Sequence, residues 1–137
     1  MDRHVVINSF RDLRVWQLGM EIVERVYTLS NTFPRDEIYG LTSQLRRAAV
    51  SVPANIAEGH SRASTKEYQR HLSIAVGSLA EVETYLELCI RLRYGRADAV
   101  SHLQELTAEE RRMLRGLQRA LQAGQLTRNN STRAPTP

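Results

Sequence analysis

The stretch that decides the fold is YQRHLSIAVGSLAEVETYLELCIRL, residues 68–92. Its apolar residues recur at alternating steps of four and three, at Tyr68, Leu72, Ala75, Leu79, Val82, Leu86 and Cys89. This is the heptad spacing of a helix that packs along its length against other helices. A second apolar face consists of Ile74, Tyr85, Leu88 and Leu92. The sequence therefore predicts a helix over about residues 65–94, with Ser64 and Glu67 as its capping box and Gly95 beyond its end.

Two segments before this stretch also have helical spacing. Residues 10–31 carry an apolar stripe, and Ser9 with Asp12 resembles a capping box at its start. After a break in the pattern, a second helix is expected over about residues 36–59. Pro53 lies inside the apolar pattern of this helix, which continues on both sides of the proline. We therefore predict a kink at Pro53 rather than a helix end.

A fourth helix is expected over about residues 97–123. Thr107 and Glu110 could form a capping box that divides this segment in two. We favour one helix, because the apolar stripe keeps its phase across Thr107. The remaining residues, 124–137, are polar and without periodicity, and they are expected to form a disordered tail.

These four segments and their short connections predict an all-α fold, an antiparallel up-down-up-down four-helix bundle over residues 9–123. Residues 1–8 are expected to be a flexible N-terminus. The length of 137 residues fits one domain. The lone cysteine, Cys89, excludes an internal disulfide framework and fits a cytoplasmic location. No targeting segment is recognised, and no apolar run reaches the roughly 20 residues of a membrane span, so no membrane association is expected.

Sequence signatures of catalysis and of cofactor or metal binding are missing. There is no G-x-x-x-x-G-K or G-x-G-x-x-G phosphate loop. The histidines are scattered, and Glu67 with His71 is at most a two-ligand clip. Cys89 falls on the heptad seam, where a buried small hydrophobe is expected rather than a nucleophile. We therefore expect no enzyme, no cofactor and no metal site.

Polar residues recur at helical spacing within the segment 36–59. Five of them share one face, and two on the next helix lie along a comparable side: Gln44, Arg47, Ser51, Asn55 and Glu58, with Ser78 and Glu81. One interpretation is a surface for a ligand or RNA. We favour a buried hydrogen-bond network, because a proline frees a backbone carbonyl that needs a donor. In this hypothesis Arg47 pairs with Glu81, Asn55 bonds near the kink, and Arg47→Ala lowers stability.

Basic residues offer a competing surface. The formal net charge is +4, and 18 of the 19 basic residues are arginine. Arginine suits phosphate and carboxylate, although a GC-rich genome would also produce this bias. The candidates for binding nucleic acid or a partner form two groups. One lies around the turn between the second and third helices and consists of Arg46, Arg62, Lys66 and Arg70. The other lies on the fourth helix and consists of Arg111, Arg112, Arg115 and Arg119. The alternative is an ordinary solvated face.

Three stretches together resemble one protein family. They are FRDLRVWQLGMEIVERVY (10–27), LTSQLRRAAVSVPANIAEGHSR (41–62) and the stretch 68–92. Their most specific motifs are RRAAVSVPANIAEG and AVGSLAEVETYL. The stretches are similar to the small four-helix-bundle proteins encoded in intervening sequences of bacterial 23S rRNA genes. The resemblance covers roughly residues 9–121.

This resemblance implies a ring-like homopentamer without an established enzymatic activity. More distant relatives act as accessory factors of diversity-generating retroelements, in which a basic pentamer binds a reverse transcriptase and nucleic acid. By analogy, RNA or DNA binding is the leading functional hypothesis, with a reverse transcriptase as a possible partner. The surplus apolar surface on the first and third helices agrees with self-association. The alternative is a protein-interaction scaffold that binds an acidic protein partner without nucleic acid.

Overall fold

The computed structural model describes residues 7–132, with side chains described to residue 124. The described chain is helical and contains no strand. Its elements are η1 (Phe10–Asp12), α1 (Arg14–Ser30), η2 (Arg35–Glu37), α2 (Leu41–His60), α3 (Thr65–Leu92) and α4 (Ala97–Thr132). The predicted all-α class and the count of four long helices are therefore confirmed.

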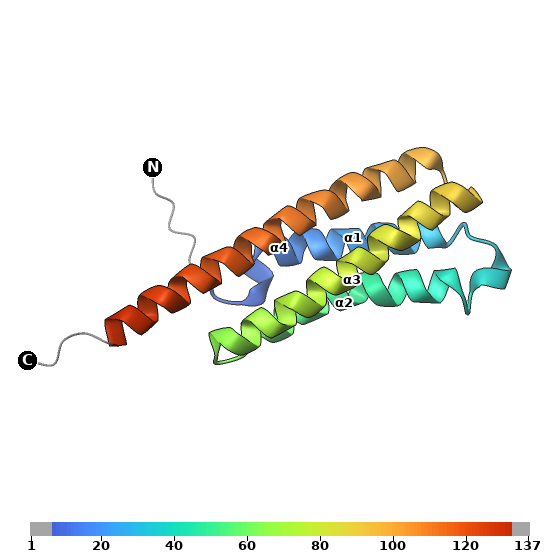
Figure 1. The fold of residues 1–137 in the computed structure, drawn as a ribbon. Helices are drawn as coiled ribbons and strands as arrows, with labels where there is room; N and C mark the ends of the chain where they lie inside the picture. Colours follow the sequence, from blue (N-terminus) through green and yellow to red (C-terminus); the bar gives the residue numbers. More distant parts are fainter. Residues whose placement is uncertain (1–6, 133–137) are drawn as a thin grey trace, which may run out of the picture.

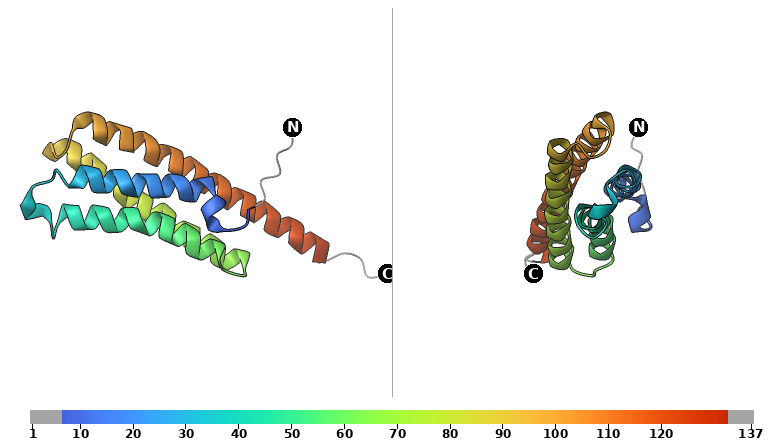
Figure 2. Two further views of the ribbon diagram at one scale, coloured as in Figure 1. Left: turned by 180° about the vertical axis from the view of Figure 1, so that it is seen from behind. Right: turned by 90° about the vertical axis from the view of Figure 1, so that its right-hand side faces the viewer.

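The connections between the long helices lie alternately at the two ends of the molecule, so successive helices run in opposite directions (Figure 1). Within the described residues, α1 packs against α2 and α4, and α3 packs against the same two helices. Seen from the end, α1 and α2 form one layer and α3 and α4 the other (Figure 2). The last part of α4 projects beyond the other three helices (Figure 1).

The predicted capping box at Ser9 is present, but it begins a 3-10 turn rather than α1. Ser9 Oγ accepts the N–H of Arg11 at 3.1 Å, and Asp12 Oδ2 accepts the N–H of Ser9 at 3.2 Å. Leu13 then takes an extended conformation with φ −78° and ψ 125°. Because this conformation interrupts the helical path, α1 begins at Arg14 and not at residue 10.

The predicted start of the second helix at residue 36 is also wrong. Residues Arg35–Glu37 form only the 3-10 turn η2, and Gly40, with φ −109° and ψ −116°, separates this turn from α2. The helix α2 continues through Pro53 without interruption, as the apolar pattern predicts. The kink itself stays a prediction. The helix ends at His60, close to the predicted end at residue 59.

The capping of α3 follows the sequence at its start. Ser64 Oγ accepts the N–H of Glu67 at 3.1 Å. At its other end α3 stops at Leu92, slightly before the predicted residue 94, because Arg93 takes the left-handed conformation with φ 61°. This conformation is usual for glycine and uncommon for a side chain such as arginine.

The helix α4 is continuous across Thr107, as predicted. Thr107 Oγ1 donates to Gln104 O at 3.0 Å, so it does not cap a new helix at Glu110. The helix continues to Thr132, past the predicted end near residue 123. No proline occurs between Ala97 and Pro135, so nothing in the backbone forces an earlier end. The rest of the predicted tail, residues 133–137, and residues 1–6 of the predicted N-terminus lie outside the described residues.

The core consists of two hydrophobic clusters stacked along the bundle. One lies toward the α1–α2 connection and includes Ile22, Leu45, Val82 and Leu103. The other lies toward the α2–α3 turn and includes Val15, Ile56, Leu72, Leu79 and Leu114. The predicted heptad seam of α3 contributes to both clusters. The seam positions between Leu72 and Cys89 are each at most 1% exposed.

Candidate nucleic-acid interface

The basic residues beside the α2–α3 turn differ in their charge balance. Arg62 Nη2 lies 2.8 Å from Glu58 Oε1, so its charge is largely neutralised. Lys66 and Arg70, one turn apart at the start of α3, are exposed. No ion pair of the described residues includes either of these two cations. They are therefore free to meet an anion.

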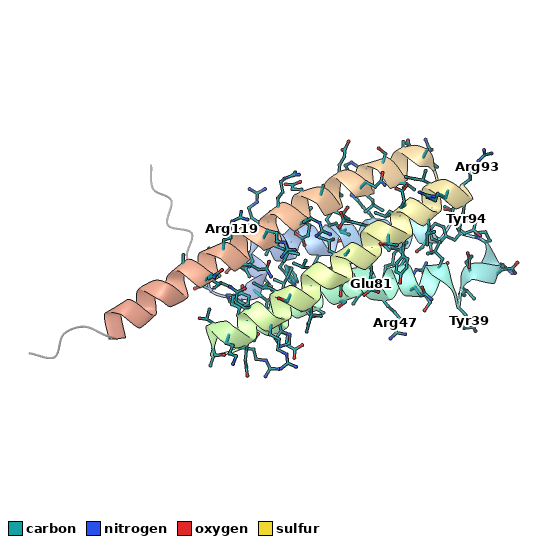
Figure 3. All side chains as sticks on the ribbon, in the orientation of Figure 1. Tyr39, Arg47, Glu81, Arg93, Tyr94 and Arg119 are labelled. Carbon is teal, nitrogen blue, oxygen red and sulfur yellow. The ribbon has the colours of Figure 1, made fainter. Side chains whose placement is uncertain are left out.

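The basic residues of α4 divide in the same way. Arg111 Nη2 pairs with Glu83 Oε1 of α3, so this arginine links the two helices. Arg115 Nη1 donates to a neutral partner, Gln118 Oε1, at 3.2 Å. Arg112 and Arg119 are exposed, and within the described part of the chain neither has an ion pair. Figure 3 shows Arg119 on α4.

A shallow polar groove lies where α3 and α4 meet. Gln69 Nε2 donates to Gln118 O at 2.7 Å and so joins the two helices. The groove has a volume of about 430 Å³ and is lined by Gln69, Arg115, Gln118, Arg119 and Gln122, with no acidic residue. The only charged residues of this lining are Arg115 and Arg119, and we name these two the basic groove residues.

Arg46 does not belong to this surface. Its Nε donates to Ser30 Oγ at 2.8 Å and its Nη2 to Asn31 Oδ1 at 3.0 Å. Its guanidinium also lies over the ring of Tyr27, 4.6 Å from the centroid. These three contacts attach α2 to the end of α1, so Arg46 has a structural part in the bundle.

The structure brings together four of the polar residues singled out in the sequence. Ser51 Oγ and Ser78 Oγ lie 2.7 Å apart, and Asn55 Nδ2 donates to Ser51 O at 2.9 Å and to Ser51 Oγ at 3.0 Å. Asn55 Oδ1 lies 3.1 Å from His71 Nδ1, and His71 Nε2 lies 4.0 Å from Glu58 Oε1. The chain of contacts links α2 to α3 along their shared side, and it is structural in character.

The other three predicted members stand outside this chain. Gln44 and Arg47 are exposed on α2, and Figure 3 shows Arg47 pointing away from the bundle. Glu81 accepts a long bond, 3.4 Å, from the hydroxyl of Tyr85. The expected Arg47–Glu81 pair is wrong, since no ion pair between these two described residues is formed. The pair does not form because α2 is rotated about its axis so that Arg47 lies on its outer side, while Ser51 and Asn55 face α3.

Sequence reasoning missed two glycines that allow close helix approach. A Cβ atom on Gly59 would lie 2.8 Å from His71 Cβ, so α2 and α3 meet closely there. A Cβ on Gly19 would lie 2.8 Å from Glu110 Oε2. Gly77, by contrast, faces outward with open space around it. Helical spacing does not identify such positions, because it does not fix how each helix is rotated.

The described residues hold no arrangement typical of metal binding or thiol chemistry. No group of three or more His, Cys, Asp or Glu among them could hold a metal ion. Cys89 is fully buried, and burial raises the pKa of its thiol to about 11. The thiol is therefore protonated at neutral pH and inaccessible to a substrate. No helix within the part of the chain searched has the length and hydrophobicity to cross a membrane.

The fold and the surface define a small antiparallel helical bundle with a basic groove between two helices. The sequence profile described as 23S rRNA-intervening sequence protein matches residues 11–116. The chain belongs to this family, and the resemblance of its three sequence stretches is confirmed.

Among solved structures, a protein of unknown function from the S23 ribosomal protein family of Bacteroides thetaiotaomicron VPI-5482 is similar in fold. The TM-score is 0.71 at 24% sequence identity, and the match covers 77% of this chain and 95% of that chain. No curated protein matches the sequence. The likeness to the solved structure supports the helical fold and carries no assignment of activity.

Proposed function

We propose that this protein is a non-enzymatic homo-oligomer, a pentameric ring, which binds nucleic acid through the basic groove residues. The observation that carries the proposal is the groove between α3 and α4. Its lining contains Arg115 and Arg119 with only neutral neighbours. Arginine donors in a fork suit phosphate oxygens, and a groove without carboxylates does not repel them.

Repetition in a ring strengthens a modest patch. One chain offers only a few uncompensated cations, and its formal net charge is +4. Several copies of the groove on one assembly would engage one nucleic-acid strand at several points, so weak contacts would add to a useful affinity. Ribosomal RNA is a natural candidate, given the family's name.

Exposed apolar side chains support the self-association in this proposal. Large hydrophobic residues are at least 36% exposed on all of the first three long helices and on the α1–α2 connection: Met20, Tyr27, Ile38, Tyr39, Val50, Ile74, Leu88, Ile90 and Leu92. Tyr39 is 93% exposed. So much apolar surface on one small chain is typical of proteins that associate. Closed symmetry then favours a ring over an open filament.

The second candidate function is a scaffold that binds an acidic protein partner through the same groove. The lack of carboxylates in the groove favours an acidic peptide as it favours phosphate. A reverse transcriptase is a further protein partner within this proposal. A cytoplasmic location also belongs to the proposal and is supported by the single, buried Cys89.

Fluorescence anisotropy tests the proposal directly. The purified protein is titrated into a labelled structured RNA and a matched DNA duplex at fixed, low salt. We expect binding that Arg115→Gln/Arg119→Gln weakens about tenfold or more, since charge-assisted phosphate contacts contribute about 1 kcal/mol or more each. The matched control, Arg35→Gln/Arg91→Gln, removes the same charge at the α1–α2 connection and in the last turn of α3, and it should leave the affinity near that of the parent.

Two outcomes would reject parts of the proposal. Equal loss of affinity in both double variants would show that net charge and not the groove binds the nucleic acid. Absence of binding to either nucleic acid at low salt would reject nucleic-acid binding and leave the acidic-partner scaffold. The ring is tested separately by light scattering, which should give five times the chain mass of 15.6 kDa.

A further inference from the structure

The most unusual buried group in the described chain is the carboxyl of Glu110 on α4. The residue is 0% exposed, and neither carboxyl oxygen has a hydrogen-bond partner among the described residues. A buried carboxylate without a partner is strongly disfavoured, whereas a protonated carboxyl needs only one acceptor for its O–H. The surroundings of Glu110 therefore decide its state.

Glu110 lies on the side of α4 that packs against α1, between the two hydrophobic clusters, and its carboxyl and Pro53 of α2 both border Gly19. Along α4 its neighbours Leu103 and Leu114 belong to different clusters. A Cβ on Gly19 of α1 would lie 2.8 Å from Glu110 Oε2 and 3.4 Å from Pro53 Cβ. The carboxyl thus occupies the space that Gly19 leaves open, next to the proline of α2.

Pro53 provides an acceptor at this point of the bundle. A proline has no N–H, so the carbonyl four residues earlier in the helix loses its usual donor. In α2 that carbonyl belongs to Ala49, which is 0% exposed and has little access to water. A buried acceptor without its helical donor and a buried carboxyl without a partner therefore lie in the same region of the core, on two helices that face each other diagonally across the bundle.

None of the ion pairs among the described residues includes Glu110, so no cation is paired with its carboxyl. On α4 the adjacent Glu109 adds a like charge, and with Arg14 and Glu21 of α1 it lines a hollow between these helices. On α3 the charged residue Glu83 pairs with Arg111, which follows Glu110 in α4. The buried residues of α2 around the proline are all uncharged: Ala48, Ala49, Val52, Pro53 and Ile56. Burial first, and then Glu109, raise the pKa of Glu110 to about 8.

We propose that Glu110 is a proton-binding switch: in the packed bundle it is a neutral acid that donates across the core to the free carbonyl of Ala49, and its ionisation loosens the packing of α4 against α1. The switch follows from the burial of the carboxyl, the space at Gly19 and the proline in α2. It is independent of nucleic-acid binding, and either idea can fail without the other.

The switch predicts a definite pH dependence of stability. Below the ordinary pKa of 4.5, Glu110 is protonated in the folded and in the unfolded chain, so the stabilising contact is fully present. As the pH rises from there toward about 8, only the unfolded chain ionises, and the folded bundle loses stability. Above about pH 8 both states are ionised, and this loss is complete.

Chemical denaturation of the parent and of Glu110→Gln from pH 5 to pH 9 tests the switch. Glutamine keeps the shape and a donor but cannot ionise. Relative to this variant, the unfolding equilibrium constant of the parent should rise about tenfold or more between pH 6 and pH 9. The control Glu24→Gln removes an exposed carboxylate from α1 and should keep the pH dependence of the parent. The same dependence in the parent and in Glu110→Gln would overturn the proposal.

A second measurement covers the case in which the Glu110 variant does not fold. The carboxyl ¹³C resonance of Glu110 in the intact parent is followed by NMR over the same pH range. A midpoint well above 6 supports the switch. A midpoint near 4.5 would overturn it, because the buried group would then be ionised throughout the neutral range.

Discussion

Gly19 of α1 and Glu110 of α4 fit together so closely that one additional carbon atom would collide. A Cβ on Gly19 would lie 2.8 Å from Glu110 Oε2. The absence of a side chain at one residue therefore makes room for a carboxyl from another helix. This contact lies between the two hydrophobic clusters, where α1 packs against α4.

The substitution Gly19→Ala should accordingly destabilise the bundle by about 1–3 kcal/mol, because overpacking forces neighbouring side chains and backbone to shift. Urea unfolding at pH 6 measures this change. In a background of Glu110→Ala the same substitution should cost much less, since the carboxyl is no longer there. Equal costs in the two backgrounds would show that Glu110 is not what occupies the space.

Removal of the Ser51 hydroxyl should lower stability by about 1–2 kcal/mol. The hydroxyl contacts Ser78 Oγ at 2.7 Å and accepts from Asn55 Nδ2 at 3.0 Å. Ser51→Ala therefore removes one hydrogen-bond partner from the Ser78 hydroxyl and one from the Asn55 amide. Thermal melts of Ser51→Ala, Ser78→Ala and the double variant measure the coupling. The two losses should be less than additive, and full additivity would contradict a direct bond between the hydroxyls.

The adjacent arginines Arg46 and Arg47 should behave differently. Arg46→Ala removes bonds to Ser30 and Asn31 and a contact with the Tyr27 ring, so a loss of about 1–2 kcal/mol is expected. Arg47 is exposed, so Arg47→Ala should change stability by less than about 0.5 kcal/mol. Parallel denaturation of the two variants tests this. A larger loss of unfolding free energy in Arg47→Ala would instead support the hydrogen-bond network predicted from the sequence.

Glycine at residue 93 should stabilise the protein. Arg93 takes φ 61° as the cap of α3, and glycine reaches this conformation without steric strain. Arg93→Gly should therefore raise the free energy of unfolding by a few tenths of a kcal/mol up to about 1 kcal/mol. Differential scanning calorimetry measures the shift, and a lowered midpoint would contradict this account of the cap.

The helices and their seams were predictable because they follow from local spacing. The heptad in residues 68–92 specifies α3 and its buried side, and the capping residues Ser9 and Ser64 mark true starts of helical structure. The errors fall where single residues leave the helical path. Leu13, Gly40 and Arg93 each do so, and their conformations depend on packing at the ends of the bundle.

The candidate site was less predictable than the fold, because its members depend on the rotation of each helix. Spacing placed Arg47 with Ser51 and Asn55, but a small rotation of α2 directs Arg47 to solvent and the others to α3. The same limit concealed Glu110, which resembled a capping residue in the sequence. Only the packing against Gly19 shows that its carboxyl is buried.

The measurement that tests the central claim most directly is the salt dependence of RNA binding by the parent and by Arg115→Gln/Arg119→Gln. A plot of log Kd against log salt concentration reports how many phosphate contacts form. If the α3–α4 groove binds phosphate, the parent should show steep salt dependence, and the double variant should lose about 0.7–0.9 of slope for each contact removed. Identical slopes for the two proteins would contradict the claim that this groove is the nucleic-acid interface.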